Sequence, residues 1–327
     1  MTKKETKGIT VIGSINIDFT VRADRLPAPG ESVIGHEFFQ AFGGKGANQA
    51  VGISRLGINP VHFVGAVGND EIGKSALASL VKNGVSTEFV RTIDGYGSGV
   101  ALIMIDSEGE NCISGAPGAN QFVDEIYLET LPDHLFQQSS LIVICQEIPL
   151  KTIAVAIQRA RTFSVPVLFN PAPPNPELQA TDLLESVSFL TPNETEVTAI
   201  TGISIEDPGD TQNKLTAMKN LVERGIPRIA ITMGSQGCFV YDKTVMKTVD
   251  ESIQLQAPKT QAIDTTAAGD SFNAALAVAI HAGKPFLEAC RWANQVASIS
   301  VTKKGAQPSL PSHDEVSRIK VDDFPPD

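Results

Sequence analysis

The feature that most constrains the fold of this chain is a repeated alternation between short apolar runs and longer stretches with helical periodicity. The clearest strand-like runs are residues 9–13, 61–67, 140–146, 165–170, 188–193 and 228–234, and the clearest helical stretches are residues 70–81, 150–162, 194–200, 268–281 and 286–301. Such alternation favours a mainly parallel sheet, because parallel strands need crossover connections, which are usually helices. We therefore predict an α/β fold, a three-layer sandwich formed by one large domain over residues 1–327.

Two segments interrupt this alternation and have the pattern of β-hairpins. Residues 19–42 contain short apolar stretches separated by the run Leu-Pro-Ala-Pro-Gly-Glu, and residues 97–114 contain two apolar stretches separated by Ser-Glu-Gly-Glu. Proline and glycine clusters between apolar runs are typical of turns that connect paired strands. We predict a small accessory β-sheet from residues 16–42 and 97–116.

The net charge of −11 limits the possible partners. Nucleic acids and anionic membranes bind to basic patches, so we expect neither as a partner. No apolar run approaches the length that spans a bilayer, and the charged residues 1–8 lack the apolar core of a signal peptide, so we expect a cytoplasmic protein. The cysteines include no C-x-x-C pair, which argues against a zinc cluster or a redox dithiol.

One motif in the chain matches a phosphate-binding loop without having its chemistry. Residues 68–75, GNDEIGKS, fit the pattern G-x-x-x-x-G-K-[ST]. A loop that wraps phosphate needs backbone amides facing the anion, whereas Asp70 and Glu71 would place two carboxylates in the wrap. We favour a helix capped by Asn69 or Asp70, with Lys74 in solvent. The apolar positions expected to face the core are Ile72, Leu77, Leu80 and Val81, and Asp106 is expected to begin a hairpin turn.

A second segment, residues 262–273, has the pattern of a strand end, a turn of small residues and the start of an apolar helix. Small side chains at Ala267, Ala268 and Gly269 would let bare amides at a helix N-terminus approach an anion such as a transferring phosphoryl group. Asp270 would be repelled by that anion unless it accepted the proton of an attacking hydroxyl. An acidic residue at a helix start is common, so it is the combination that indicates phosphoryl transfer.

This segment resembles the carboxyl-terminal signature of the ribokinase family of carbohydrate kinases, Asp-Thr-x-Gly-Ala-Gly-Asp, with Ala267 where glycine is commoner. Residues 42–50, FGGKGANQA, are similar to the amino-terminal signature of the same family. The glycines there allow close approach to a polyol, and Lys45 and Asn48 offer donors to its hydroxyls. The two signatures occur in the same order along this chain as in members of the family.

The resemblance implies a set of site residues. The residues expected to bind the sugar are Asn16, Asp18, Gly44, Lys45, Asn48, Glu147 and Asp270. Those expected at the nucleotide are Asn193, Thr232, Gly234, Gly237, Gly269 and Asn294, with Glu196 organising Mg²⁺. Those expected around a K⁺ ion are Asp264, Thr266, Ser300, Lys303, Gly305 and Ser309, with backbone carbonyls as ligands and the lysine heads in water. The expected cofactors are therefore ATP, Mg²⁺ and K⁺.

The activity implied by the resemblance is ATP-dependent phosphorylation of a sugar, with Asp270 as the base and amides of residues 267–269 as an anion hole. The strings 44–48 and 304–309 resemble ribokinases more than fructokinase or adenosine kinase relatives, which favours D-ribose, phosphorylated at O5 to D-ribose 5-phosphate. The accessory sheet would be a lid, through which we expect a homodimer. Alternatives are a kinase for deoxyribose or a nucleoside, a non-catalytic sugar sensor on the same fold, and a P-loop ATPase.

Overall fold

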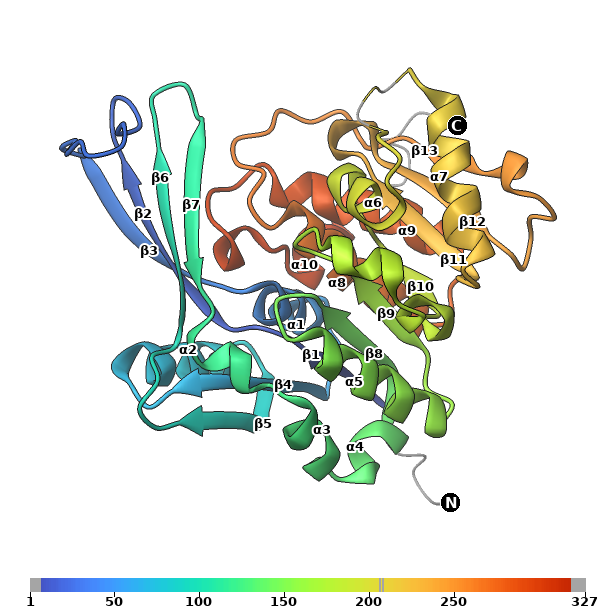
Figure 1. Cartoon of the computed structure of the whole chain (residues 1–327), viewed down its shortest axis with the longest axis horizontal. Coiled ribbons are helices and arrows are strands. Elements are labelled where there is room, and N and C mark those ends of the chain that lie inside the picture. The colour runs from blue at the N-terminus through green and yellow to red at the C-terminus, as the bar shows by residue number, and fades with distance from the viewer. Residues whose placement is uncertain (1–6, 206, 208, 319–327) are drawn as a thin grey trace.

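A nine-stranded sheet forms the centre of the chain, in the order β13-β12-β11-β10-β9-β8-β1-β4-β5 (Figure 1). The structure, a computed structural model, describes residues 7–205, 207 and 209–318. All neighbouring strands from β5 to β11 pair in parallel, and only the β11-β12-β13 edge is antiparallel. The strands are β1 Gly8–Ile12, β4 Val61–Gly68, β5 Val85–Ile93, β8 Ser139–Cys145, β9 Val167–Asn170, β10 Phe189–Leu190, β11 Arg228–Thr232, β12 Cys238–Asp242 and β13 Ile253–Leu255.

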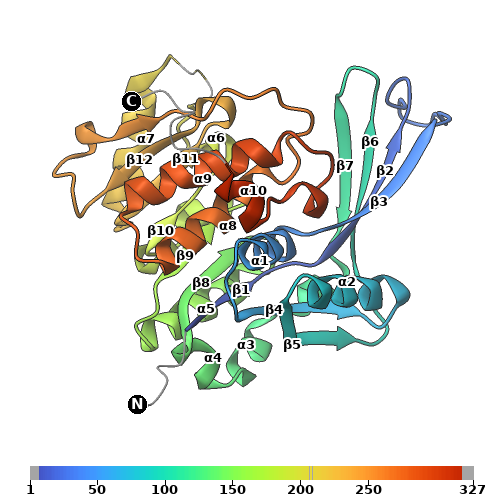
Figure 2. The same cartoon turned by 180° about the vertical axis from the view of Figure 1, so that it is seen from behind.

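Helices cover both faces of this sheet, so the predicted three-layer α/β fold is confirmed (Figures 1 and 2). One face carries α3 Glu125–Thr130, α4 Asp133–Gln137, α5 Leu150–Thr162, α6 Glu194–Thr201 and α7 Thr211–Glu223. The other carries α1 Lys45–Arg55, α2 Glu71–Lys82, α8 Ala268–His281 and α9 Phe286–Ser300, and the short helix α10, His313–Ser317, follows. Successive strand residues contribute to the two cores in turn, as a sheet buried on both sides requires.

The two predicted hairpins join into a separate four-stranded sheet, which confirms the accessory sheet. Strands β2 Asn16–Arg22 and β3 Glu37–Gly43 form one hairpin, and β6 Gly99–Ile105 and β7 Asn111–Ala116 form the other. They meet through a parallel pairing of β2 with β6. In Figures 1 and 2 this sheet stands beside the C-terminal segments that lead into α8.

The segment that imitates a phosphate-binding loop is a helix start, as predicted. Asp70 caps α2 by accepting a hydrogen bond from the Gly73 amide at 2.7 Å, and it also accepts the backbone N–H of Ser98 at 2.8 Å. Lys74 is exposed and pairs with Glu71. Asp106 accepts two backbone amides in the β6–β7 turn, as expected.

Two details of the helix prediction are wrong: Val81 is 60% exposed, and Ile72 lines a pocket with Phe19 and Phe42 of the small sheet and does not join the core. The buried face of α2 runs through Gly73, Ala76 and Leu80, and Val81 lies about 100° around the helix from Leu80.

All four cysteines are free, and three of them are buried. Within residues 7–205, 207 and 209–318, no helix is long and apolar enough to cross a membrane. The ends of the domain predicted over residues 1–327, at 1–6 and 319–327, lie outside the described residues.

Candidate active site

The site residues predicted from distant parts of the sequence come together at the carboxyl ends of the central strands, where open α/β sheets bind ligands. Asp270 lies in the first turn of α8 and is buried. Its Oδ2 accepts a hydrogen bond from Asn48 Nδ2 at 2.9 Å, and its Oδ1 accepts one from Gln49 Nε2 at 3.1 Å. The first contact joins the two signatures, which lie more than two hundred residues apart in the chain.

The environment of Asp270 sets its acidity through opposing effects. Burial raises the pKa of its carboxyl, while the Lys45 charge and the two amide donors lower it, and the pKa stays raised overall. Burial alone would lower the pKa of the Lys45 ammonium, but Asp270, Glu147 and Glu196 reverse that effect and raise it. Lys45 therefore stays charged, and it is the cation around which the site carboxylates gather.

Glu147 follows β8 and holds the start of α1. Its Oε2 accepts the Lys45 backbone N–H at 2.9 Å and also bonds to the Ser14 hydroxyl. The cap position before Lys45 needs glycine, because Gly44 has φ +87° and a Cβ there would lie 2.7 Å from the Asn16 nitrogen. The sequence predicted Glu147 as a sugar ligand and did not predict this anchoring role.

Asn16 and Asp18 lie at the start of β2, where the small sheet leaves the main body. Asn16 Oδ1 accepts a hydrogen bond from Asn120 Nδ2 at 2.8 Å, and the same Asn120 side chain pairs with both backbone groups of Ile15. Burial, then Glu147 and Asp270, raise the pKa of Asp18 to about 6. Asn120, which sequence reasoning missed, therefore fixes the segment that presents Asp18.

The turn before Asp270 has an unusual backbone. Ala267 lies in the left-handed region with φ 60°, which costs a non-glycine residue about 1 kcal/mol. The Ala268 N–H donates to Thr265 O at 3.1 Å, so it is used within the turn. In the described part of the chain, no acceptor is found for the Ala267, Gly269 and Asp270 amides. These three N–H groups at the start of α8 are therefore open to an anion.

The six residues predicted for the nucleotide line one cavity of about 330 Å³, together with Ala268 and Phe272. They are Asn193, Thr232, Gly234, Gly237, Gly269 and Asn294. A second cavity of about 360 Å³ continues from Gly234, Ala268 and Asn294 along residues 257–260. Asn294 Nδ2 already donates to Leu255 O at 3.2 Å, so this side chain also ties α9 to β13.

Glu196 is buried and takes part in a capping box at the start of α6. Its Oε2 accepts the Asn193 N–H at 2.8 Å, and Asn193 Oδ1 accepts the Glu196 N–H at 2.8 Å. Burial raises the pKa of its carboxyl. No group of three or more His, Cys, Asp or Glu side chains arranged to hold a metal occurs within the described ranges.

The segments predicted around K⁺ are adjacent. Asp264 accepts the Thr266 N–H at 2.9 Å and the Gly305 N–H at 2.8 Å, and the Ile263 N–H donates to Val301 O at 2.7 Å. The hydroxyls of Ser300 and Ser309 each donate to a nearby carbonyl, which leaves their lone pairs available. The Lys303 head pairs with Glu315 at a half-exposed position, and Lys304 is exposed.

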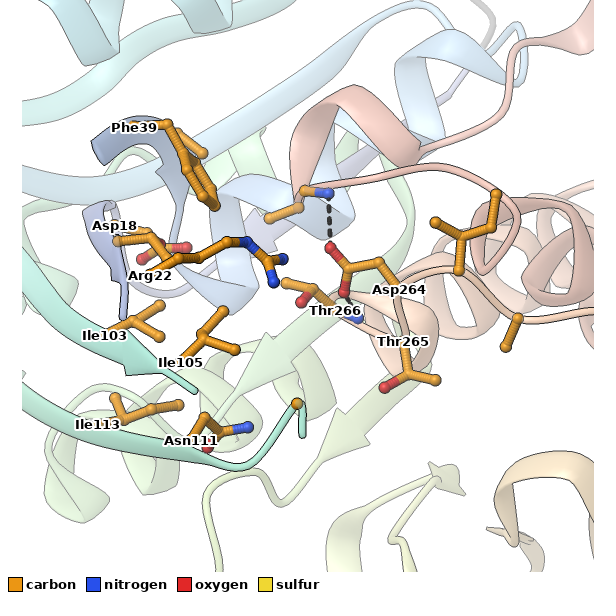
Figure 3. A pocket seen from close by; sticks show the side chains of 17 residues that line it. Asp18, Arg22, Phe39, Ile103, Ile105, Asn111, Ile113, Asp264, Thr265 and Thr266 are labelled. Atoms are coloured by element: carbon orange, nitrogen blue, oxygen red, sulfur yellow. Dashed lines mark hydrogen bonds between the residues drawn. The ribbon is translucent and has the colours of Figure 1, made fainter. Parts of the chain in front are cut away.

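A third cavity, of about 410 Å³, separates the small sheet from the turn at 262–266 (Figure 3). Asp18, Ile103 and Ile113 line its sheet side, and Asp264 lies opposite. Arg22 extends across it toward Asp264 and also pairs with Glu37 at 3.4 Å. Asp18 thus lies where this cavity meets the carboxylate cluster.

Comparison with known proteins agrees with this architecture. Residues 6–313 match the pfkB family of carbohydrate kinases. The chain belongs to this family and is a carbohydrate kinase, as its two signatures predicted.

Proteins similar to this chain include ribokinases and deoxyribokinases. The ribokinase of Haemophilus influenzae is 37% identical, over 94% of this chain and 97% of the relative. The deoxyribokinase of Salmonella typhimurium is 32% identical, over 93% of this chain and 95% of the relative. The structure of Arabidopsis thaliana ribokinase complexed with ribose and ATP superposes with a TM-score of 0.82 at 30% identity, covering 96% of this chain and 98% of that one.

The raised pKa of Asp18 gives a testable effect on stability. The folded state holds the Asp18 proton up to about pH 6, whereas the unfolded chain releases it near 3.8, so the free energy of unfolding falls as pH rises through that range. We predict that Asp18→Asn raises the free energy of unfolding by about 1–3 kcal/mol at about pH 8 and by less at about pH 5. Urea unfolding at both pH values measures this. An Asp18→Asn variant no more stable than wild type at the higher pH would contradict the assignment.

Proposed function

We propose that this protein phosphorylates D-ribose at O5 with ATP and releases D-ribose 5-phosphate and ADP. The observation that carries the proposal is the Asp270 carboxylate, buried and held by two side-chain amides, beside the open N–H groups of Gly269 and Asp270. This pairs a proton acceptor with an anion site in one helix turn. The H. influenzae ribokinase and the ribose-bound A. thaliana structure support the choice of sugar and nucleotide.

The reaction is an in-line displacement at the γ-phosphorus. The O5–H proton passes to the Asp270 carboxylate as O5 bonds to phosphorus, and the bond to the β,γ-bridging oxygen breaks, with its electron pair leaving on ADP. The open amides of Gly269 and Asp270 hold the charge on the transferring group. The Ala267 amide completes this anion hole, while Ala268 contributes less because its N–H is already used.

Each substrate has a cavity that suits it. The nucleotide lies in the cavity lined by Asn193, Gly237 and Asn294, with its phosphates toward Gly269. The sugar lies where Asp18, Lys45 and Asp270 converge, under the small sheet as a lid. Its hydroxyls bind to Asn16, Asp18, Gly44, Lys45, Asn48 and Glu147.

A Mg²⁺ ion would suit this chemistry, because it would neutralise phosphate charge and would need few protein carboxylates. Glu196, which caps α6 beside the cavity residue Asn193, would hold this ion, and the capping box uses only its Oε2.

The second candidate is a kinase for deoxyribose, and the similarity to the Salmonella deoxyribokinase favours it over a nucleoside kinase or a sugar sensor. It uses the same base and the same anion hole. Only the sugar acceptor distinguishes a deoxyribose kinase from a ribose kinase.

The role of Asp270 and the acceptor can be tested together. We expect wild type to release ADP fastest with D-ribose in a panel of pentoses, hexoses, deoxyribose and nucleosides. Asp270→Asn should lower kcat by about 10²–10⁴-fold, because the base is lost, while ATP binding by calorimetry is kept. Asp133→Asn, an exposed acid at the start of α4, is the matched control and should keep wild-type turnover. A near-normal kcat in Asp270→Asn would show that Asp270 is not the base. Faster turnover of another acceptor would show that ribose is not the preferred substrate.

A K⁺ ion fits between Asp264 and the loop 300–309, where it would stiffen the turn that carries the anion hole. We expect kcat/KM to fall about 5- to 100-fold when K⁺ is replaced by tetramethylammonium at equal ionic strength, the usual range for coupling between sites. Asp264→Asn, which loses the carboxylate beside Gly305, should respond less to the exchange. Equal activity in the two cations would contradict this role.

The outer face of the small sheet supports a homodimer. Phe19 and Phe38 stack on that face with ring centroids 6.4 Å apart, and Phe38, Leu102 and Met104 are exposed there. We expect a dimer by sedimentation at micromolar concentration, and a monomer for Leu102→Lys, since a charge would be buried at the contact. Ile126→Lys, at an exposed position of α3, is the control and should remain a dimer. A monomeric wild type would contradict the proposed dimer.

A cytoplasmic location stays a prediction.

A further inference from the structure

A chain of buried polar side chains leads away from Asp270 on the side of Gln49. The Gln49 amide nitrogen donates both to Asp270 Oδ1 and to Asn170 Oδ1, each at 3.1 Å. Asn170, the last residue of β9, donates in turn to Thr191 O at 3.0 Å. All of these side chains are less than a tenth exposed. The carboxylate is thus tied through α1 to the ends of two central strands.

The same chain returns to α8. The Thr191 hydroxyl donates to Asn273 Oδ1 at 2.6 Å, and Asn273 Nδ2 donates to Gly269 O at 2.8 Å. Gly269 and Asp270 are neighbours, so the hydrogen bonds form a closed ring that starts at the carboxylate and ends in the turn with the open amides. Thr191 also lies two residues before Asn193, which lines the nucleotide cavity.

Stability alone does not account for this ring. Gln49 is fully buried, and its Oε1 has no hydrogen-bond partner among the described residues. A buried amide oxygen without a partner costs about 1–3 kcal/mol, whereas an apolar side chain of similar length would pack at that point without this cost. What the amide adds is a fixed direction for one oxygen of Asp270.

We propose that Gln49 is a positioning residue for phosphoryl transfer, and that Asn170, Thr191 and Asn273 hold it and the 267–270 turn in one fixed geometry. The proposal rests on the role of Asp270 proposed above. With Asn48 on Oδ2 and Gln49 on Oδ1, the carboxylate cannot rotate freely, yet each oxygen keeps a lone pair. The base and the anion hole are then aligned before the substrates bind, which is where transfer reactions gain much of their rate.

A matched pair of substitutions tests the ring without touching the base. Thr191→Val removes the hydroxyl that donates to Asn273, and Thr10→Val removes an equally buried hydroxyl, which bonds to Ser139 at 2.8 Å in the β1–β8 pair. Thr10→Val loses one buried hydrogen bond, and Thr191→Val loses one together with a longer contact to Phe169 O at 3.4 Å, so both should unfold at lower urea concentrations. We expect only Thr191→Val to lower the single-turnover rate, by about 3- to 30-fold, with KM for sugar and ATP near wild type.

A second variant tests Gln49 directly. Gln49→Met keeps the length of the side chain and removes both donors, and we expect kcat to fall about 10- to 100-fold. The lost donor also leaves the pKa of Asp270 higher, so the acid limb of the kcat–pH profile should move to higher pH. The charged groups that surround Asp270, namely Lys45, Asp18, Glu147 and Glu196, are unchanged in this variant.

The outcomes separate this inference from the proposed function. All rates are measured on the acceptor that wild type turns over best. If that acceptor is not ribose, the proposed substrate is wrong, but the same variants still test the hydrogen-bonded ring. Equal single-turnover rates for Thr191→Val and Thr10→Val would overturn the inference, as would Gln49→Met with an unshifted pH profile. If Asp270→Asn keeps the wild-type rate, Asp270 is not the base, and Gln49 then has no base to position.

Discussion

The attraction between the Asp270 carboxylate and the Lys45 ammonium is the interaction on which the rest of the site depends. Burial raises the pKa of Asp270 and opposes the charge on Lys45, and each charged group offsets part of the effect of burial on the other. This pairing requires the first turns of α1 and α8 to come close. Small residues permit it: a Cβ on Gly52 of α1 would lie only 2.7 Å from the Ala274 Cβ of α8. Gly52, just beyond the amino-terminal signature, therefore lets α1 and α8 pack closely.

Much of this architecture could be predicted from the sequence, because local pattern determines it. The helix 150–162 and the start of α8 at Ala268 follow from periodicity and turn chemistry, and the signatures place Lys45 and Asp270. The ring through Gln49 and Asn170 could not be predicted, since these two residues lie over a hundred positions apart and each member of the ring looks like an ordinary polar residue. A polar residue that closes a buried strand, as Asn170 closes β9, is the only local signal.

Several side chains have a structural contact that their expected binding role does not reveal. Glu147 fixes the start of α1, Glu196 caps α6, and Asn294 ties α9 to β13. A substitution at any of them would change binding and local geometry together, so lost activity alone does not identify a ligand. Asp270 also has such a contact, because its acceptor atoms bind Asn48 and Gln49 and so join α8 to α1.

Ala267 has a consequence for how such a chain can evolve. Proteins persist just above the stability that their function demands, so a strained backbone position is a reserve that selection has not used. A left-handed alanine at the start of α8 costs about 1 kcal/mol, and glycine would remove that strain without adding an atom near the substrates. A lineage that acquired this glycine could tolerate one more destabilising substitution elsewhere, for instance in the small sheet.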